Sequence, residues 1–218
     1  ASSQLFLGGA TSSEANKIIF TVASSEGMRL TSTGLGIGTS SPSFKLDVSV
    51  TDTTAYSTSA YSYEPVRITN SGAGGVSGIL FQALSTGTAN TAQATISAIA
   101  ESASSKNTAL TFGTRENSGG TLPERMRLDS AGNLGLGVTP SAWTTYKALQ
   151  ISSTAALSAA SGGDFVISNN ANYNSGFKYL TTAAATFYYQ YAGAHSWHTA
   201  ASGTAGNAIS FTQAMTLD

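Results

Sequence analysis

The feature that most constrains the fold of this chain is a motif that occurs twice in full and begins a third time. Each full copy runs Glu-x-Met-Arg-Leu, then a short turn containing Ser and Gly, then Leu-Gly-(Ile/Leu)-Gly. The copies occupy residues 26–39 and 124–140, and the third begins at Met215. Self-similarity of this kind is typical of repeat architectures, in which each unit packs mainly against its neighbours. We therefore expect an elongated stack.

The residue types within the motif predict two short strands joined by a tight turn. Met and Leu alternate with Arg, a period of two, and the glycine of the turn supplies the positive φ that a reversing chain needs. The Gly-x-Gly pair weakens an isolated strand, so we expect another backbone, from a neighbouring chain, to lie close to that face. The motif residues are Met28, Arg29, Leu30, Gly34, Gly36 and Gly38, and Met126, Arg127, Leu128, Gly132, Gly135 and Gly137.

The arginines of the motif lie on the strand face opposite Met and Leu. We expect Arg29 and Arg127 to pair with acidic residues on neighbouring strands or chains, and Glu26 and Glu124 are the candidates. The alternative is a solvated arginine without a partner, because exposed ion pairs contribute only ~0–1 kcal/mol.

A second marker, an apolar segment with a Phe, precedes each Met. The three segments are Lys17–Thr21, Ala109–Gly113 and Ala208–Thr212, and subtracting residue numbers gives Phe-to-Met gaps of 8, 14 and 4. A fixed strand pair with a variable connector predicts a hairpin. Further strands are expected at Lys45–Val50, Tyr63–Thr69, Gly78–Ala83, Thr95–Ala100, Leu149–Ser152, Asp164–Ser168, Gly176–Leu180 and Phe187–Tyr191. The Ala-rich stretches at Thr154–Ala160 and Thr181–Ala185 have no apolar helix face.

Composition excludes several classes of function. Only 10% of residues are charged and the net charge is −1, which gives the chain no electrostatic attraction for nucleic acid or acidic membranes. With 41% hydrophobic residues the chain must bury apolar surface somewhere. There is no cysteine, and no apolar run approaches the ~18 residues of a membrane span. We expect no cofactor, no metal and no membrane insertion.

Many short strands create many sheet edges, which natural proteins protect with charge, proline or closure. This chain has few charges and four prolines. The edges are protected if several identical chains wrap around one axis. The sequence therefore predicts a homo-oligomer, with the number of chains left open by the residues themselves.

Two segments of the motif carry a family resemblance. Residues 126–140 read MRLDSAGNLGLGVTP and residues 36–48 read GIGTSSPSFKLDV. Both closely resemble the shaft repeats of phage tail fibre and tail spike proteins. The resemblance implies an all-β, elongated, intertwined trimeric fibre of β-prism or β-helix type. It further implies a structural, extracellular virion component that supports host attachment, with other tail proteins and host-surface glycans as candidate partners. From the residues themselves we expect no enzymatic activity. A bacterial surface adhesin stalk is the related alternative.

The repeats divide the chain into segments. Residues 1–25 are expected to end an upstream repeat, residues 26–123 and 124–213 to form two repeats, and residues 214–218 to begin a third. Nothing in the chain resembles the endosialidase-type chaperone that ends many tail fibres, so we expect any such domain, or a receptor-binding tip, to lie beyond Asp218 or to have been removed.

An aromatic cluster at residues 187–197 is the candidate ligand site, because sugars stack their apolar faces on Tyr and Trp. Alternation puts Phe187, Tyr189 and Tyr191 on one face of a strand, where they are expected to fill the interior. Tyr188 and Trp197 then form the outward set. The candidate glycan-binding residues are Tyr188, Tyr191 and Trp197.

Other chemistry is poorly supported. The Gly-x-Gly-x-Gly pattern at residues 34–38 lacks the following helix and Lys-Ser/Thr of a phosphate cradle. His195 and His198 should point to opposite faces of a strand, so only a three-fold axis that gathers copies of one of them would bind a metal. Ser196 is expected to partner neither histidine. Sparse acids argue against the paired carboxylates of a glycan depolymerase.

Overall fold

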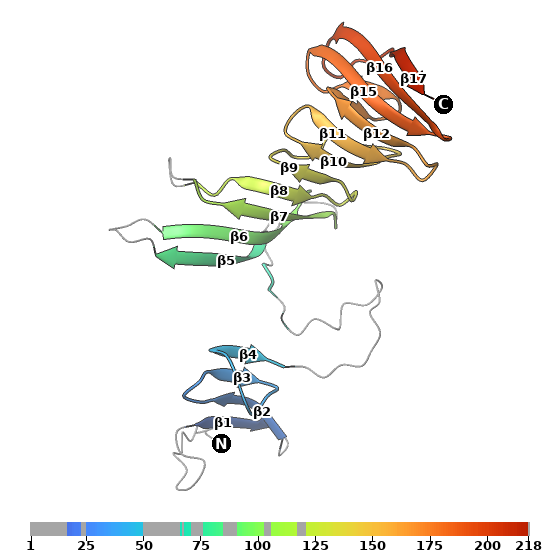
Figure 1. Ribbon diagram of the computed structural model, residues 1–218. Helices are drawn as coiled ribbons and strands as arrows, with labels where there is room; N and C mark the ends of the chain where they lie inside the picture. Colours follow the sequence, from blue (N-terminus) through green and yellow to red (C-terminus); the bar gives the residue numbers. More distant parts are fainter. Residues whose placement is uncertain are drawn as a thin grey trace. The chain divides into compact units, whose positions relative to one another are not determined.

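The computed structural model describes residues 17–22, 25–49, 66, 68–70, 76–84, 91–102, 106–116 and 121–217. These residues form strands, turns and loops and contain no helix, so the predicted all-β class is confirmed (Figure 1). None of them belongs to a helix long and apolar enough to span a membrane. The chain divides into two compact units, residues 1–68 and 69–218, which are described separately.

The first unit contains a four-stranded sheet. Its strands follow chain order, with β1–β2 and β2–β3 antiparallel and β3–β4 parallel. The strands are β1 (Ile18–Val22), β2 (Ser25–Leu30), β3 (Leu35–Ile37) and β4 (Leu46–Val48).

The second unit contains an eleven-stranded sheet that also follows chain order, interrupted only by a separate hairpin, β13–β14. All of its strand pairs are antiparallel except β9–β10. The first strands are β5 (Val76–Leu84), β6 (Thr91–Ala100), β7 (Thr108–Thr114), β8 (Glu124–Leu128), β9 (Leu134–Leu136), β10 (Lys147–Ile151), β11 (Ala155–Ala159) and β12 (Phe165–Asn169). The others are β13 (Ala171–Tyr173), β14 (Phe177–Tyr179), β15 (Ala183–Tyr191), β16 (Ala194–Gly203) and β17 (Thr212–Leu217).

Most of the strands predicted outside the motif are present, with bounds that differ by a few residues. Both Ala-rich stretches contribute to strands, β11 and the start of β15. The segment Tyr63–Thr69 lies mostly outside the described residues, and the described positions 66, 68 and 69 are not in a strand. Val50 also lies outside the described residues.

The strands of the two full copies of the motif pair in the same register. Phe20 pairs with Met28 and Phe112 with Met126, as the marker pattern predicted, and each Met strand then forms the expected hairpin with the Leu-Gly strand. The prediction is wrong for the third copy. Phe211 lies in a loop, where its ring packs 4.4 Å from that of Phe187.

Trp197 occupies the position in the third copy that Phe holds in the other two. It pairs with Met215 across β16 and β17, in the register that Phe20 and Phe112 have with their Met partners. The sequence marker at residues 208–212 was therefore a coincidence of composition. Residues 208–211 lie instead in the connection between β16, which ends at Gly203, and β17, which begins at Thr212.

A β-bulge explains how the motif arginines find their partners. The register shifts by one residue just before each Met, leaving Gly27, Arg125 and Ala214 as the extra residues. A bulge changes which face the following side chains occupy. Residues three apart, such as Glu124 and Arg127, therefore share a face.

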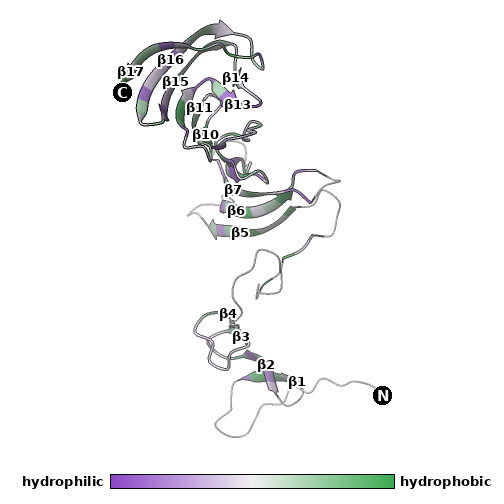
Figure 2. Cartoon of the chain, turned by 90° about the vertical axis from the view of Figure 1, so that its right-hand side faces the viewer, coloured by the Kyte–Doolittle hydropathy of each residue, from purple (hydrophilic) through white to green (hydrophobic). Residues whose placement is uncertain are grey.

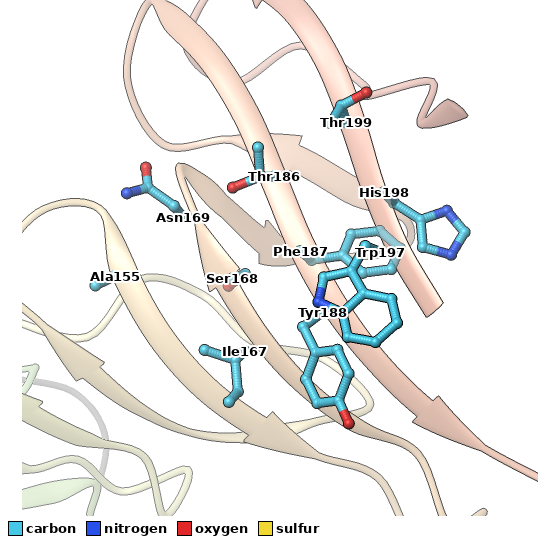
Figure 3. Close-up of a pocket in the computed structure, with 10 residues that line it drawn as sticks. All are labelled: Ala155, Ile167, Ser168, Asn169, Thr186, Phe187, Tyr188, Trp197, His198 and Thr199. Carbon is cyan, nitrogen blue, oxygen red and sulfur yellow. The ribbon is translucent and has the colours of Figure 1, made fainter. Parts of the chain in front are cut away.

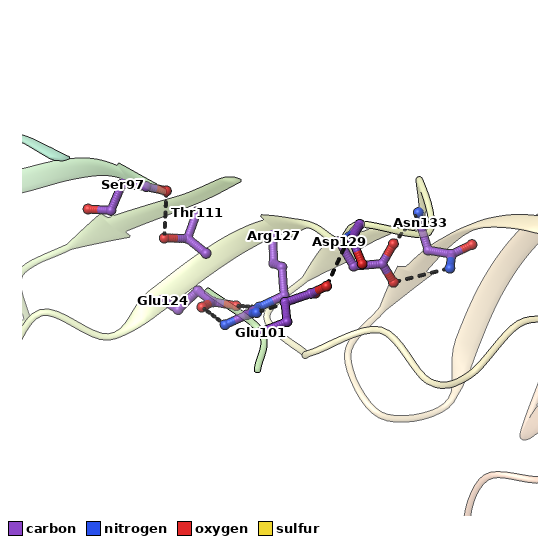
Figure 4. A network of polar contacts seen from close by, with 8 residues as sticks. Ser97, Glu101, Thr111, Glu124, Arg127, Asp129 and Asn133 are labelled. Carbon is purple, nitrogen blue, oxygen red and sulfur yellow. Dashed lines mark hydrogen bonds and ion pairs between the residues drawn. The ribbon is translucent and has the colours of Figure 1, made fainter. Parts of the chain in front are cut away.

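The predicted partners Glu26 and Glu124 are confirmed, but the prediction that they lie on neighbouring strands or chains is wrong, because each pair lies within one strand. Arg127 donates from Nε and Nη2 to the two carboxylate oxygens of Glu124, both at 2.7 Å (Figure 4). Arg29 donates from Nε to Glu26 Oε1 at 2.7 Å, and this hydrogen bond lowers the pKa of Glu26. The pair therefore holds the bulge of its own strand.

The close backbone contact predicted for the Gly-x-Gly pair exists, but the neighbour is the same chain. A Cβ on Gly36 would lie 2.7 Å from Thr39 O, and one on Gly135 would meet Val138 O and lie 2.9 Å from Pro140 Cδ. Gly38 and Gly137 have φ values of 72° and 68°. The two glycines let the loop fold back over its own strand and lead into the parallel strand. The Gly-x-Gly pattern is therefore no evidence for a neighbouring chain.

The two turn glycines play different roles. Gly132 has the predicted positive φ of 83°, whereas Gly34 is not among the residues with positive φ, so that prediction is wrong there. A Cβ on Gly34 would lie 2.6 Å from Lys45 Cα. The second copy has Asn133 at this position, 1% exposed, and its Oδ1 accepts a hydrogen bond from Ala148 N at 3.2 Å.

The packed core lies on one face of the second unit's sheet. The hairpin β13–β14 and the loop 141–146 pack against strands β10–β12, β15 and β16. The buried core residues are Trp143, Tyr146, Ala148, Ala156, Val166, Ala171, Tyr179, Ala185 and Phe187. The opposite face of these strands is not covered by any described residue.

Asn170 links the hairpin to the sheet, and replacing it should destabilise the unit. The residue is 1% exposed with φ of 59°, and its Nδ2 donates to the carbonyls of Thr181 and Ala183 while its Oδ1 accepts from Thr181 N. We expect Asn170→Ala to cost about 2–4 kcal/mol, because buried backbone groups lose their partners. Denaturant unfolding measures this. Ser175→Ala is the control, since Ser175 is exposed with a similar φ of 53°; equal losses in both variants would contradict the prediction.

Candidate functional site

Large apolar side chains form two continuous rows on the uncovered face of the second unit's sheet. Neighbours within each row are directly opposite across adjacent strands. The first row runs Leu110, Leu128, Leu134, Leu149, Leu157, Ile167, Tyr188, Trp197 and Met215. The second row runs Ile79, Ile96, Phe112, Met126, Leu136 and Ile151. These residues are called the apolar face below.

The apolar face is exposed in a single chain. Leu128 is 42% exposed, Leu136 47%, Ile167 44% and Met215 54%. Figure 2 shows apolar residues, in green, on strands along the sheet from β5 to β17. Scattered exposed leucines are ordinary, but a contiguous apolar area that crosses a whole sheet marks an interaction surface.

The first unit repeats the same two rows. Leu30 is 44% exposed, Ile37 39% and Leu46 62%. The rows run Ile18, Leu30, Leu35 and Leu46, and Phe20, Met28, Ile37 and Val48. Because both units present the rows in one register, the exposed face is a property of the motif.

The opposite face of the motif strands is polar. Arg127 lies 3.9 Å from Glu101 in addition to its pair with Glu124, and Thr111 Oγ1 donates to Ser97 O at 3.3 Å (Figure 4). Asp129 accepts hydrogen bonds from both nitrogens of Asn133 at 2.7 and 3.1 Å. These groups satisfy one another within the chain, so this face needs no partner.

The aromatic cluster is divided between the two faces as alternation predicted. Phe187 is 8% exposed in the core, whereas the Tyr188 and Trp197 rings belong to the apolar face with centroids 5.1 Å apart. A shallow pocket of 460 Å³ lies beside them (Figure 3). Its lining includes Ile167, Asn169, Thr186, Tyr188, Trp197 and Thr199. The predicted glycan role of Tyr188, Tyr191 and Trp197 stays a prediction, and these three do not share a face.

A second pocket, of 340 Å³, lies on the covered side of the sheet at β15, β16 and β17. Tyr191 is 50% exposed there, and its ring is nearly parallel to that of Tyr189, at 14° with centroids 5.8 Å apart. The pocket is lined by Tyr146, Phe177, Phe187, Tyr189, Tyr191, Ala194, Ser196, His198, Gln213 and Thr216. Sequence reasoning missed Tyr146, Phe177 and Gln213, because they come from segments far apart in the chain.

The histidines point to opposite faces, as predicted. Tyr188 Oη and His195 Nδ1 form a hydrogen bond on the apolar face, and Tyr188 Oη also accepts from Gln190 Nε2 at 2.9 Å. His198 lies on the other face, stacked on Phe187 with centroids 4.4 Å apart. The described residues contain no group of three His, Asp or Glu placed to hold a metal ion.

The expectation that Ser196 partners neither histidine is wrong. His198 Nε2 lies 2.9 Å from Ser196 Oγ, because residues two apart in a strand share a face. Burial lowers the pKa of His198, which favours the neutral form of its ring. Among the described residues, no carboxylate is hydrogen-bonded to His198 to complete a catalytic triad.

Asp164 joins two tyrosines at the edge of the core, which predicts a loss of stability at alkaline pH. It accepts from Tyr146 Oη at 2.8 Å and from Tyr189 Oη at 3.1 Å. The pKa of Tyr146 is raised, and the pKa of Tyr189 is raised to about 12. In both residues burial is the larger cause and the hydrogen bond to Asp164 is the second. A tyrosine pKa that is higher in the folded than in the unfolded chain means that the protonated hydroxyl stabilises the folded state.

The stabilisation by these tyrosines is therefore complete below the ordinary tyrosine pKa of 10.0 and is lost as the pH rises from there through about 12. Melting temperatures should be measured from about pH 8 to about pH 11.5, a range that includes the ordinary tyrosine pKa. They should fall at the alkaline end. Tyr146→Phe should show a shallower fall. A profile of equal slope in both proteins would contradict the assignment.

Neither a family model nor a curated protein sequence matches this chain. Its function is therefore inferred from its own residues.

Proposed function

We propose that the chain is a structural segment of a bacteriophage tail fibre, in which three copies bury their apolar faces around a common axis. The observation that carries the proposal is the exposed apolar face, present in one register in both units. The segment would be an extracellular virion component that supports host attachment, with identical chains and other tail proteins as its partners.

Burial of the apolar face supplies a large driving force for assembly. Complete burial of one Leu, Ile or Met side chain stabilises by ~1.5–3 kcal/mol, so the remaining half of each exposed residue contributes about 1 kcal/mol. None of the residues in the rows carries a charge, which removes the main cost of bringing identical surfaces together. The sum over both rows and every chain exceeds the cost of association.

Rotation about an axis parallel to the stacking direction suits this surface. It places the same residue of each chain at the same height along the axis, so Leu128 contacts its own copies. Each of the other residues in the rows would likewise contact its own copies. The number three rests on the resemblance of residues 126–140 to tail-fibre shaft repeats. The internally satisfied polar face then contacts water.

Negative-stain electron microscopy of the purified chain tests the fibre. We expect slender rods, because each repeat adds length along the axis, with a wider part where hairpin β13–β14 covers the sheet. Compact particles, as wide as they are long, would contradict the proposal.

A further inference from the structure

We propose that the pocket beside Tyr189 and Tyr191 binds an uncharged sugar. This pocket lies on the side of the sheet opposite the apolar face, between β15, β16 and β17. The inference rests on the proposed function in one respect. Assembly through the apolar face would cover Tyr188 and Trp197 and leave this pocket as the aromatic surface open to a ligand.

The size and lining of the pocket suit one or two sugar rings. Its 340 Å³ is near the lower end of the ~300–1,000 Å³ typical of small-molecule sites. The Phe177 and Phe187 rings are stacked at 20° with centroids 5.1 Å apart and form an apolar floor. Tyr191, half exposed and supported by Tyr189, offers a flat ring face on which the C–H groups of a pyranose stack.

Polar groups stand around this apolar floor. Ser196 Oγ and His198 Nε2, from two residues that line the pocket, form one hydrogen-bonded pair. The Gln213 amide and the Tyr191 hydroxyl have no hydrogen-bond partner among the described residues, although both line the pocket. An amide and a hydroxyl each donate and accept, which is what the vicinal hydroxyls of a sugar require.

The charge of the site selects a neutral ligand. No Lys, Arg, Asp or Glu is among the residues that line it. The nearby carboxylate of Asp164 already accepts hydrogen bonds from Tyr146 and Tyr189. A sialic or uronic acid would find no cation there, so its carboxylate would lose water without a charged partner.

Titration calorimetry on the native assembly tests the site. The probes are the methyl glycosides of glucose, galactose, N-acetylglucosamine and rhamnose, with methyl glucuronide as the charged comparison. We expect at least one neutral glycoside to bind with millimolar affinity. Tyr191→Ala and Gln213→Ala should each weaken that binding about tenfold. Tyr188→Ala tests the other face of the sheet, and Ala205→Glu, in an exposed turn outside the pocket, is the control that should leave the affinity unchanged.

Three results would overturn the inference. These are no binding of any neutral glycoside, tighter binding of the glucuronide, or a loss of affinity in Tyr188→Ala with none in Tyr191→Ala. The mass of each sample separates the two proposals. A single chain that binds sugar would refute the trimer and keep the pocket, whereas an assembly that binds none would refute the pocket and keep the fibre.

Discussion

Replacing Leu128 and Leu136 together with glutamate is expected to separate the assembly into single chains. In one chain these side chains are 42% and 47% exposed, so glutamate there costs little. In the proposed fibre they meet their copies at the axis, where each carboxylate loses water and faces two like charges. Unpaired buried charges cost several kcal/mol each. Light scattering should show a fall in mass, and circular dichroism should show whether the single chain keeps its strands.

Ala205→Glu is the matched control for this double variant. Ala205 is exposed in a turn of the same unit, away from both rows, and only its backbone N–H is engaged, donating to Thr182 Oγ1. The control should retain the wild-type mass. An unchanged mass in the Leu128 and Leu136 double variant would show that the apolar face does not join the chains.

Gly135→Ala is expected to lower the free energy of unfolding by about 2–3 kcal/mol, as for an overpacked core. The added methyl group would meet Val138 O and Pro140 Cδ, which belong to the loop that returns the chain to β10. Neither is the flexible end of a side chain, so the loop must move. For a chain of this length the melting temperature should fall by roughly 5–10 °C.

Gly162→Ala provides the comparison at a glycine without neighbours. A Cβ there meets nothing within 4 Å, and its φ is not in the left-handed region. The variant should change stability by less than about 0.5 kcal/mol. Equal melting temperatures for Gly135→Ala and Gly162→Ala would contradict the role given to the Gly-x-Gly pair.

The repeat predicted much of the motif because its signal is local. Alternation gave the strands, the hairpins and the division of Tyr188 from Tyr189 between faces. The pairing of Arg127 with Glu124 was also predicted, but an unbroken strand would separate residues three apart. The bulge at Arg125 that unites them has no marker in the sequence, since the extra residue is Gly, Arg or Ala in the three copies.

Long-range packing could not be predicted from these patterns. Phe211 has the local sequence of a motif strand, yet its ring is used by the core around Phe177 and Phe187. Trp197 takes the strand position instead, because pairing between β16 and β17 depends on the whole sheet. The aromatic pocket draws Tyr146, Phe177 and Gln213 from three separate segments, and no spacing in the sequence connects them.

The native mass, measured by light scattering, tests directly whether the chain is a monomer with exposed apolar rows or an assembly that buries them. The chain weighs 22.1 kDa. Burial of those rows between three copies predicts a single species of three times that mass at micromolar concentration. A stably folded species of 22.1 kDa under the same conditions would contradict it.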